Sequence, residues 1–103
     1  HVSILEYGTY SVASPEACAS IVWRDSSKAA DAAEAMRVGA SDLIKIGIVD
    51  EIISEPSGGA HQDFDETSAN IKTSLLSNIA ALSKLTSEEL LSRRYKRLLS
   101  IGA

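Results

Sequence analysis

"SDLIKIGIVDEII", residues 41–53, is the stretch that decides the fold class of this chain. Its first half predicts a short helix with Ser41 as the N-cap. Gly47 follows that helix, where the missing Cβ removes the steric penalty of a left-handed backbone. Its second half predicts a strand over residues 48–53, in which four apolar residues surround a polar pair. A helix, a glycine and a strand in this order are typical of an α/β fold.

Upstream of this stretch, a strand is expected to run directly into a helix. Residues 1–12 are rich in β-branched, leucine and tyrosine side chains, which predicts a strand with an irregular exit near Gly8. Ser14 can then cap a helix, Pro15 suits its first position, and Glu16 places negative charge at the positive end of the helix dipole.

The helix from Pro15 to Trp23 is expected to bury one face, and a second helix should follow it. Residues 24–27, "RDSS", can end the first helix and cap the second, which the alanine-rich residues 28–37 predict. Gly39 then interrupts helical structure. The helical spacing assigns three side chains to the buried face of the first helix: Cys18, Ile21 and Val22.

Downstream, a glycine-containing loop separates this region from two consecutive helices. The organisation expected from the sequence is a core over residues 1–56, a loop over 57–66 and an αα-hairpin over 67–103. Thr86 and Glu89 form a capping-box pattern at the start of the second helix. Apolar side chains recur at helical spacing in both helices: Ile71, Leu75, Ile79 and Leu82, then Leu91, Tyr95 and Leu98.

The composition limits the classes of function that this chain can serve. Its 103 residues suffice for one small domain, and its net charge of −4 disfavours nucleic acid or an anionic membrane as a partner. The only cysteine is Cys18, so no intrachain disulfide and no cysteine cluster for zinc is expected, and a reducing compartment is indicated. No apolar run approaches the length of a membrane span.

Three features allow a functional interpretation beside a structural one. "GGAH", residues 58–61, could present the amides of Gly59 and Ala60 to an oxyanion beside His61, although a solvent-exposed loop is the favoured interpretation. Tyr7 and Tyr10 could line a pocket, or pack simply as core and rim residues. "SRRYKR", residues 92–97, could complement the dipole of the last helix or bind an acidic partner surface, whereas nucleic acid is disfavoured.

Three longer segments carry a resemblance to a known family. They are "ILEYGTYSVASPEACASIVWRDSSKAADAAEAM" (4–36), "LIKIGIVDEIISEPSGGAH" (43–61) and "RRYKRLLSIG" (93–102), of which residues 10–21 and 55–61 are the most specific. Together they resemble the C-terminal part of the carboxyltransferase alpha subunit of the bacterial and plastid-type acetyl-CoA carboxylase. The resemblance covers almost the whole chain.

The resemblance implies an α/β, crotonase-like fold and an enzymatic function. The implied reaction transfers a carboxyl group from carboxybiotin, held on a carrier protein, to acetyl-CoA, giving malonyl-CoA for fatty-acid synthesis. The implied partners are the carboxyltransferase beta subunit and the biotin carboxyl carrier protein, in an ATP-binding hetero-oligomer of the bacterial cytoplasm or plastid stroma. No metal is expected on this chain.

The resemblance also implies which part of the catalytic machinery this chain contains. The family's oxyanion glycines have no counterpart here, so no catalytic residue is assigned, and the chain is expected to be a fragment that is inactive alone. Five residues in family segments are candidates for the pocket or the subunit interface: Tyr7, Tyr10, Gly58, Gly59 and His61. The alternative function is a non-catalytic helical module that binds a partner protein.

Overall fold

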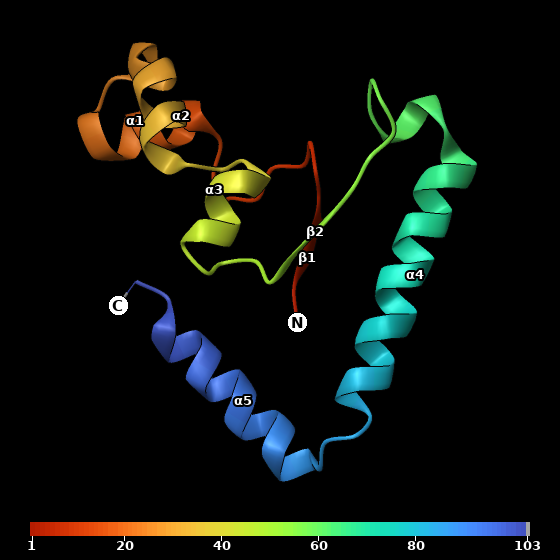
Figure 1. Cartoon of the computed structure of the whole chain (residues 1–103). Coiled ribbons are helices and arrows are strands. Elements are labelled where there is room, and N and C mark those ends of the chain that lie inside the picture. Colours follow the sequence, from red (N-terminus) through yellow and green to blue (C-terminus); the bar gives the residue numbers. More distant parts are fainter. Residues whose placement is uncertain (103) are drawn as a thin grey trace.

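The computed structural model describes residues 1–102 and has a mixed α/β architecture (Figure 1). Within these residues the sheet has two short parallel strands, β1 (Ser3–Leu5) and β2 (Glu51–Ile53), in which Ile4 pairs with Ile52. Three helices form the crossover between the strands: α1 (Pro15–Trp23), α2 (Ala29–Met36) and α3 (Ala40–Lys45). A parallel pair requires such a crossover, so the predicted α/β class is confirmed at this level.

The ends of α1 follow the predicted signals. The Ser14 hydroxyl accepts the Ala17 N–H at 3.1 Å, Pro15 occupies the first turn, and Arg24 ends the helix in a left-handed conformation. Asp25 then accepts the Ser27 N–H at 3.0 Å and caps a 3₁₀ turn over Ser26–Lys28 that leads into α2. The "RDSS" segment therefore ends one helix and starts the next.

Three predicted boundaries are wrong. Gly39, with extended backbone angles, is the N-cap of α3 in place of Ser41. The strand predicted over 48–53 starts at Glu51, because Ile48 and Val49 donate their N–H groups back to Leu43 as the chain leaves α3. The strand predicted over 1–12 ends at Leu5.

Gly8 explains why the first strand stops early. Its N–H donates to the Leu5 carbonyl at 2.8 Å, which closes a turn immediately after β1. A Cβ at this position would lie 3.1 Å from both the Ile4 side chain and the Leu5 carbonyl oxygen, closer than most side-chain contacts, so the turn favours glycine. The predicted irregular exit near Gly8 is confirmed.

The hydrophobic core is small and lies between α3 and the two strands. Ile4, Ala40, Leu43 and Val49 are buried, and three partly buried residues pack against them: Val2, Ile48 and Ile52. Helices α1 and α2 pack against each other, each burying one alanine, Ala19 and Ala32.

The prediction that Cys18, Ile21 and Val22 form a buried face of α1 is wrong. Ile21 and Val22 are 76% and 62% exposed, while Cys18 is partly buried. Contact between α1 and α2 is made through small side chains instead, because alanines allow two short helices to approach closely. The larger apolar side chains of α1 consequently have no cover within residues 1–102.

Two longer helices complete the chain, α4 (Phe64–Leu82) and α5 (Ser87–Ser100). Both have the expected capping: Asp63 accepts the Glu66 N–H, and Thr86 and Glu89 form the predicted capping box. Helix α4 begins inside the range predicted as loop, and residue 103 of the predicted helical region lies outside the described residues. The two helices diverge as an open V and do not pack against each other along their length (Figure 1).

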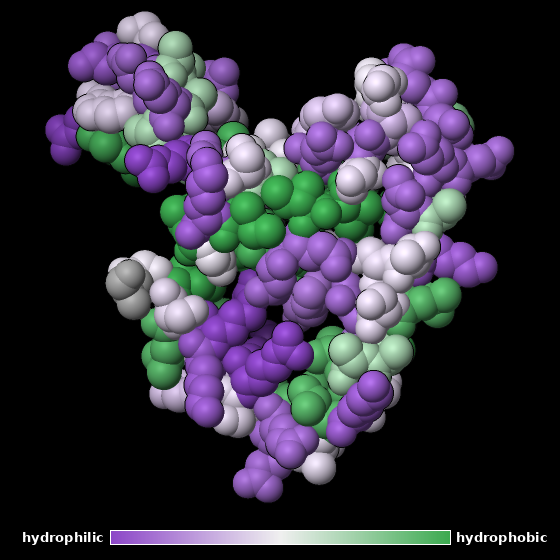
Figure 2. All heavy atoms as spheres, in the orientation of Figure 1, coloured by the Kyte–Doolittle hydropathy of each residue, from purple (hydrophilic) through white to green (hydrophobic). Residues whose placement is uncertain are grey.

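The open arrangement leaves apolar side chains on the surface (Figure 2). Leu75 and Ile79 on α4 are 53% and 59% exposed, and Leu91, Tyr95 and Leu98 on α5 are also exposed. Among the helices of residues 1–102, none combines the length and the apolar character that crossing a bilayer requires.

Candidate functional site

A single carboxylate brings two of the candidate segments together. Glu55 follows β2, and its Oε2 accepts the Tyr7 N–H at 2.6 Å while its Oε1 accepts the Ala60 N–H at 2.9 Å. In the reverse direction, the Glu55 N–H donates to Glu6 Oε1 at 3.0 Å. The exit of β1 and the "GGAH" loop are thus held against the same residue, although Tyr7 and His61 are 54 positions apart in the chain.

The loop amides are already used within the protein. The Gly59 N–H donates to the Pro56 carbonyl at 2.9 Å, and the Ala60 N–H donates to Glu55. Neither amide is free to stabilise an oxyanion, so the oxyanion interpretation of this loop does not fit its geometry. The loop is a structural turn, and the anion that its Ala60 amide binds is the carboxylate of Glu55.

Both glycines of the loop are required by the backbone. Gly58 and Gly59 adopt φ values of +88° and +110°, a region that disfavours side chains. A Cβ on Gly59 would also lie 3.0 Å from the His61 imidazole, and Gly59 is buried. The imidazole therefore packs over a position that only glycine can occupy.

Helix α4 anchors the loop from its other side. The hydroxyl oxygen of the buried Thr67 lies 3.1 Å from the Ala60 carbonyl oxygen and 2.8 Å from the Asp63 carbonyl oxygen, so its one proton is shared between them. The Asn70 amide donates to the Ser54 carbonyl at 3.1 Å. The loop is consequently fixed at both ends, which gives the exposed His61 a defined position.

The two tyrosines do not form a shared pocket. Both side chains are more than half exposed. Tyr7 is tied to the loop through its N–H, whereas the Tyr10 N–H donates to the Val38 carbonyl at 3.0 Å, next to the start of α3. Tyr7, Gly58, Gly59 and His61 are therefore brought together, and Tyr10 belongs to a neighbouring part of the surface.

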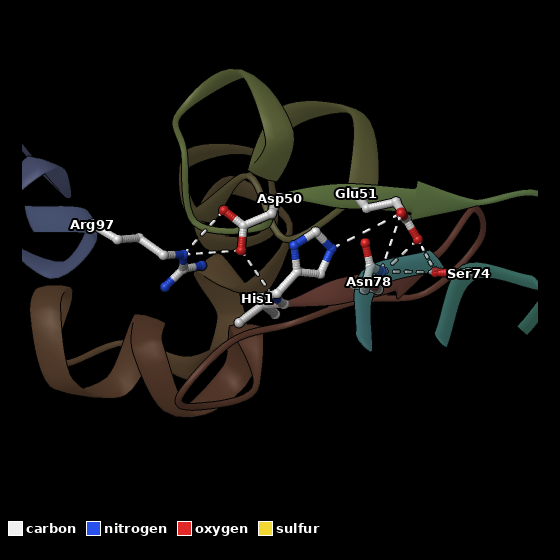
Figure 3. Close-up of polar contacts among 8 residues, drawn as sticks. His1, Asp50, Glu51, Ser74, Asn78 and Arg97 are labelled. Carbon is white, nitrogen blue, oxygen red and sulfur yellow. Dashed lines mark hydrogen bonds and ion pairs between the residues drawn. The ribbon is translucent and has the colours of Figure 1, made fainter. Parts of the chain in front are cut away.

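A second polar cluster lies at the start of β2 and connects it to α5 (Figure 3). Arg97 donates from Nε to both oxygens of Asp50, at 3.0 and 2.9 Å, and from Nη2 to the Ile48 carbonyl at 2.6 Å. Asp50 also accepts the Val2 N–H at 2.7 Å. Partial burial opposes ionisation of Asp50, but the Val2 N–H and the Arg97 guanidinium outweigh it and hold the pKa of this carboxyl below its usual range.

The neighbouring Glu51 connects β2 to α4 (Figure 3). Its carboxylate accepts hydrogen bonds from the Ser74 hydroxyl and from the Asn78 amide, the latter at 3.4 Å. His1 Nε2 lies 3.9 Å from the same carboxylate and forms an ion pair when the imidazole is protonated. Asp50 and Glu51 are adjacent in sequence, and they bind different arms of the V. Asp50 contacts α5, and Glu51 contacts α4.

Sequence reasoning missed the residues that organise these sites. Glu55, Asp50 and Glu51 are acidic residues at the ends of a short strand, and such residues commonly face solvent. Two signals existed: the placement of Asp50 and Glu51 within an apolar run, and the basic stretch on α5 that lacked a partner. Within residues 1–102, no three His, Cys, Asp or Glu side chains gather closely enough to hold a metal ion.

Comparisons with known proteins place this chain in a family. Residues 1–102 match the family model described as acetyl co-enzyme A carboxylase carboxyltransferase-like. A relative from Photobacterium profundum, the acetyl-coenzyme A carboxylase carboxyl transferase subunit alpha, is 54% identical over 102 residues. Proteins of the same name from Vibrio cholerae and Histophilus somni are 54% and 52% identical over 102 and 101 residues.

The matches cover nearly all of this chain and a smaller part of each relative. For the Photobacterium protein they cover 99% of this chain and 32% of the relative, and for the Histophilus protein 98% and 32%. The chain therefore spans about a third of the length of these relatives. On the family match across residues 1–102, it belongs to the acetyl-CoA carboxylase carboxyltransferase family.

Proposed function

We propose that this chain forms part of the carboxyltransferase component of acetyl-CoA carboxylase, as a segment of its alpha subunit. The proposed reaction moves a carboxyl group from carboxybiotin to the methyl carbon of acetyl-CoA and gives malonyl-CoA. The observation that carries the proposal is the family match over residues 1–102, together with identities above 50% to several alpha subunits. The complete subunit is proposed to have a crotonase-like fold.

Within that reaction, the segment is proposed to shape and position the site. Transfer of the carboxyl group requires stabilisation of the thioester enolate and of the biotin ureido oxygen. The amides of Gly59 and Ala60 are committed to other acceptors, so this loop does not fit that task. Tyr7, Gly58, Gly59 and His61 are proposed instead as wall or subunit-interface residues, held in place by Glu55. Tyr10 is proposed for the interface.

The proposed partners are those of a multisubunit enzyme. They are the carboxyltransferase beta subunit, the biotin carboxyl carrier protein that presents carboxybiotin, and acetyl-CoA as the acceptor substrate. The proposed location is the bacterial cytoplasm or the plastid stroma.

The test is a transfer assay with the intact polypeptide that the gene encodes. The polypeptide is combined with the beta subunit and a carrier protein loaded with labelled carboxybiotin, and labelled malonyl-CoA is measured with and without acetyl-CoA. Label should appear in malonyl-CoA only with acetyl-CoA and with both subunits present. A complete, folded complex that transfers no label would overturn the proposal.

A non-catalytic interaction module is the second candidate, and one observation favours it. Helices α1, α4 and α5 all carry large exposed apolar side chains, which is typical of surfaces that pack against other chains. The same assay separates the two candidates. A subunit that binds its partner normally but supports no transfer would favour the module.

A further inference from the structure

A hollow lies on the inner side of the V, between α5, the end of α4 and the start of the chain. It has a volume of about 540 Å³ and combines cationic and apolar walls. Figure 2 shows strongly hydrophilic and apolar side chains meeting on this part of the surface. The walls that matter here are Arg93, Arg94 and Arg97 together with Leu82, Leu90 and Leu98.

The three arginines share one face of α5 but have different partners. Arg97 is four residues from Arg93 and three from Arg94, spacings that place side chains next to each other on a helix. Arg97 forms an ion pair with Asp50 and donates to the Ile48 carbonyl. Across residues 1–102, neither Arg93 nor Arg94 has a carboxylate within ion-pair distance. The carboxylate of Asp50, which also lines the hollow, is already neutralised by Arg97.

Complementing the helix dipole explains only one of these arginines. Arg97 is the basic residue of the last turn of α5, whereas Arg93 and Arg94 lie before that turn, where the dipole has little effect. Arg93 and Arg94 both line the hollow beside its leucine wall and have no ion-pair partner within the described residues.

We propose that this hollow binds a small phosphomonoester with an apolar body. A guanidinium donates hydrogen bonds in a planar fork, and the charge of a phosphate dianion balances two guanidinium groups, whereas the charge of a carboxylate balances one. Leu90 and Leu98 flank Arg94 by one helical turn on either side and supply the surface for the apolar body. The concave shape and net negative chain favour a small soluble ligand over a nucleic acid or a lipid surface. This site is independent of the proposed carboxyl transfer.

The test uses phenyl phosphate and calorimetric titration of the intact polypeptide. Phenyl phosphate should bind saturably and more tightly than inorganic phosphate or benzoate, and added salt should weaken it. The double variant Arg93→Gln/Arg94→Gln should lose at least about tenfold in affinity, because each charge-assisted hydrogen bond contributes substantially. Lys96→Gln is the matched control, since Lys96 lies on the same helix but does not line the hollow.

Further measurements keep the proposal testable if the double variant unfolds. Arg93→Lys/Arg94→Lys retains both charges and should keep part of the affinity, and NMR should show ligand-induced shifts of the Arg93 and Arg94 Nε signals. Absence of saturable binding, equal affinity in the Gln variant, or binding only to phosphatidylcholine vesicles that contain phosphatidic acid would each overturn it.

Discussion

At the scale of single residues, Glu55 is the side chain on which the candidate site depends. The change Glu55→Gln keeps the size of the side chain but replaces one acceptor oxygen by a donor and removes the charge. One of the hydrogen bonds from Tyr7 and Ala60 must then be lost. We expect the protein to lose about 1.5–3 kcal/mol of stability, the range for hydrogen bonds to charged groups. Amide hydrogen exchange at Tyr7 and Ala60 should become faster.

Glu34→Gln is the matched control for Glu55. Glu34 is exposed on α2, and no hydrogen bond or ion pair of its side chain occurs within residues 1–102. Its replacement should leave both stability and exchange at the loop unchanged. Unaltered exchange of Tyr7 and Ala60 in Glu55→Gln would contradict the bracing role.

Asp50 leads to a prediction about pH. Its pKa in the folded chain lies below the ordinary value of 3.8. At a pH between the folded and the unfolded pKa, the unfolded chain therefore binds more protons than the folded one. The stabilisation is therefore fully present above the unfolded pKa and is lost as the pH falls through the folded pKa. Asp50→Asn should unfold more easily than the parent chain at neutral pH, and this difference should shrink in acid.

Urea unfolding at a series of pH values measures this effect. The control is Asp31→Asn, because Asp31 is exposed on α2 and the replacement should leave the pH dependence of the parent chain in place. An Asp50→Asn chain whose stability falls toward acid as steeply as that of the parent would show that the contact with Arg97 is not the cause.

At the scale of the elements, the capping box of α5 can be tested directly. The Thr86 hydroxyl accepts the Glu89 N–H at 3.2 Å, and the Glu89 carboxylate accepts the Thr86 N–H at 2.9 Å. Thr86→Ala removes the cap and should destabilise α5 by about 1 kcal/mol. Helical circular dichroism during thermal unfolding is the measurement. Ser87→Ala, one position later, should have almost no effect, and an equal loss in both variants would exclude the capping explanation.

Local signals explain which elements could be predicted from the sequence. The starts of α1 and α5 depend on side chains within a few residues, Ser14 with Pro15 and Thr86 with Glu89, so the pattern alone indicates them. Strand length depends on a distant partner. Residues 1–12 have strand character throughout, but β1 pairs only over Ser3–Leu5, because β2 itself has three residues and Gly8 closes a turn.

Burial and site geometry were harder to predict for the same reason. The spacing of Ile21 and Val22 places them on one face of α1, but that face is exposed, because α2 packs against the alanines of α1. In the candidate site, the glycines and His61 were recognisable as a special loop. Glu55 was not, because its role appears only when β1 and the loop are brought next to each other in space.

At the scale of the whole molecule, the chain is unusually open. Its radius of gyration is 16.7 Å, whereas a compact domain of about 100 residues has about 13 Å. The core consists of four buried residues, and the two arms of the V are tied to it mainly by the polar contacts of Asp50 and Glu51. A molecule with so small a core and so much exposed apolar surface is suited to pack against further protein.

The exposed face of α4 provides the prediction at this scale. Leu75 and Ile79 are neighbours one turn apart and, with Ile71, line a shallow apolar groove. If this face packs against another part of the enzyme, each side chain contributes about 1.5–3 kcal/mol on burial. The double variant Leu75→Gln/Ile79→Gln should therefore weaken assembly of the intact polypeptide with the proposed beta subunit by at least about tenfold, measured by sedimentation velocity.

The fold itself should tolerate these replacements, because both side chains are already more than half exposed. Thr73→Gln/Ala80→Gln adds the same side chains at exposed positions of α4 that do not line the groove and should assemble normally. Equal assembly of both double variants would mean that the apolar face is not an interface. Loss of helical circular dichroism in Leu75→Gln/Ile79→Gln would instead mean that the face is covered by the rest of the same polypeptide, because only an intramolecular contact contributes to the stability of the unassembled subunit.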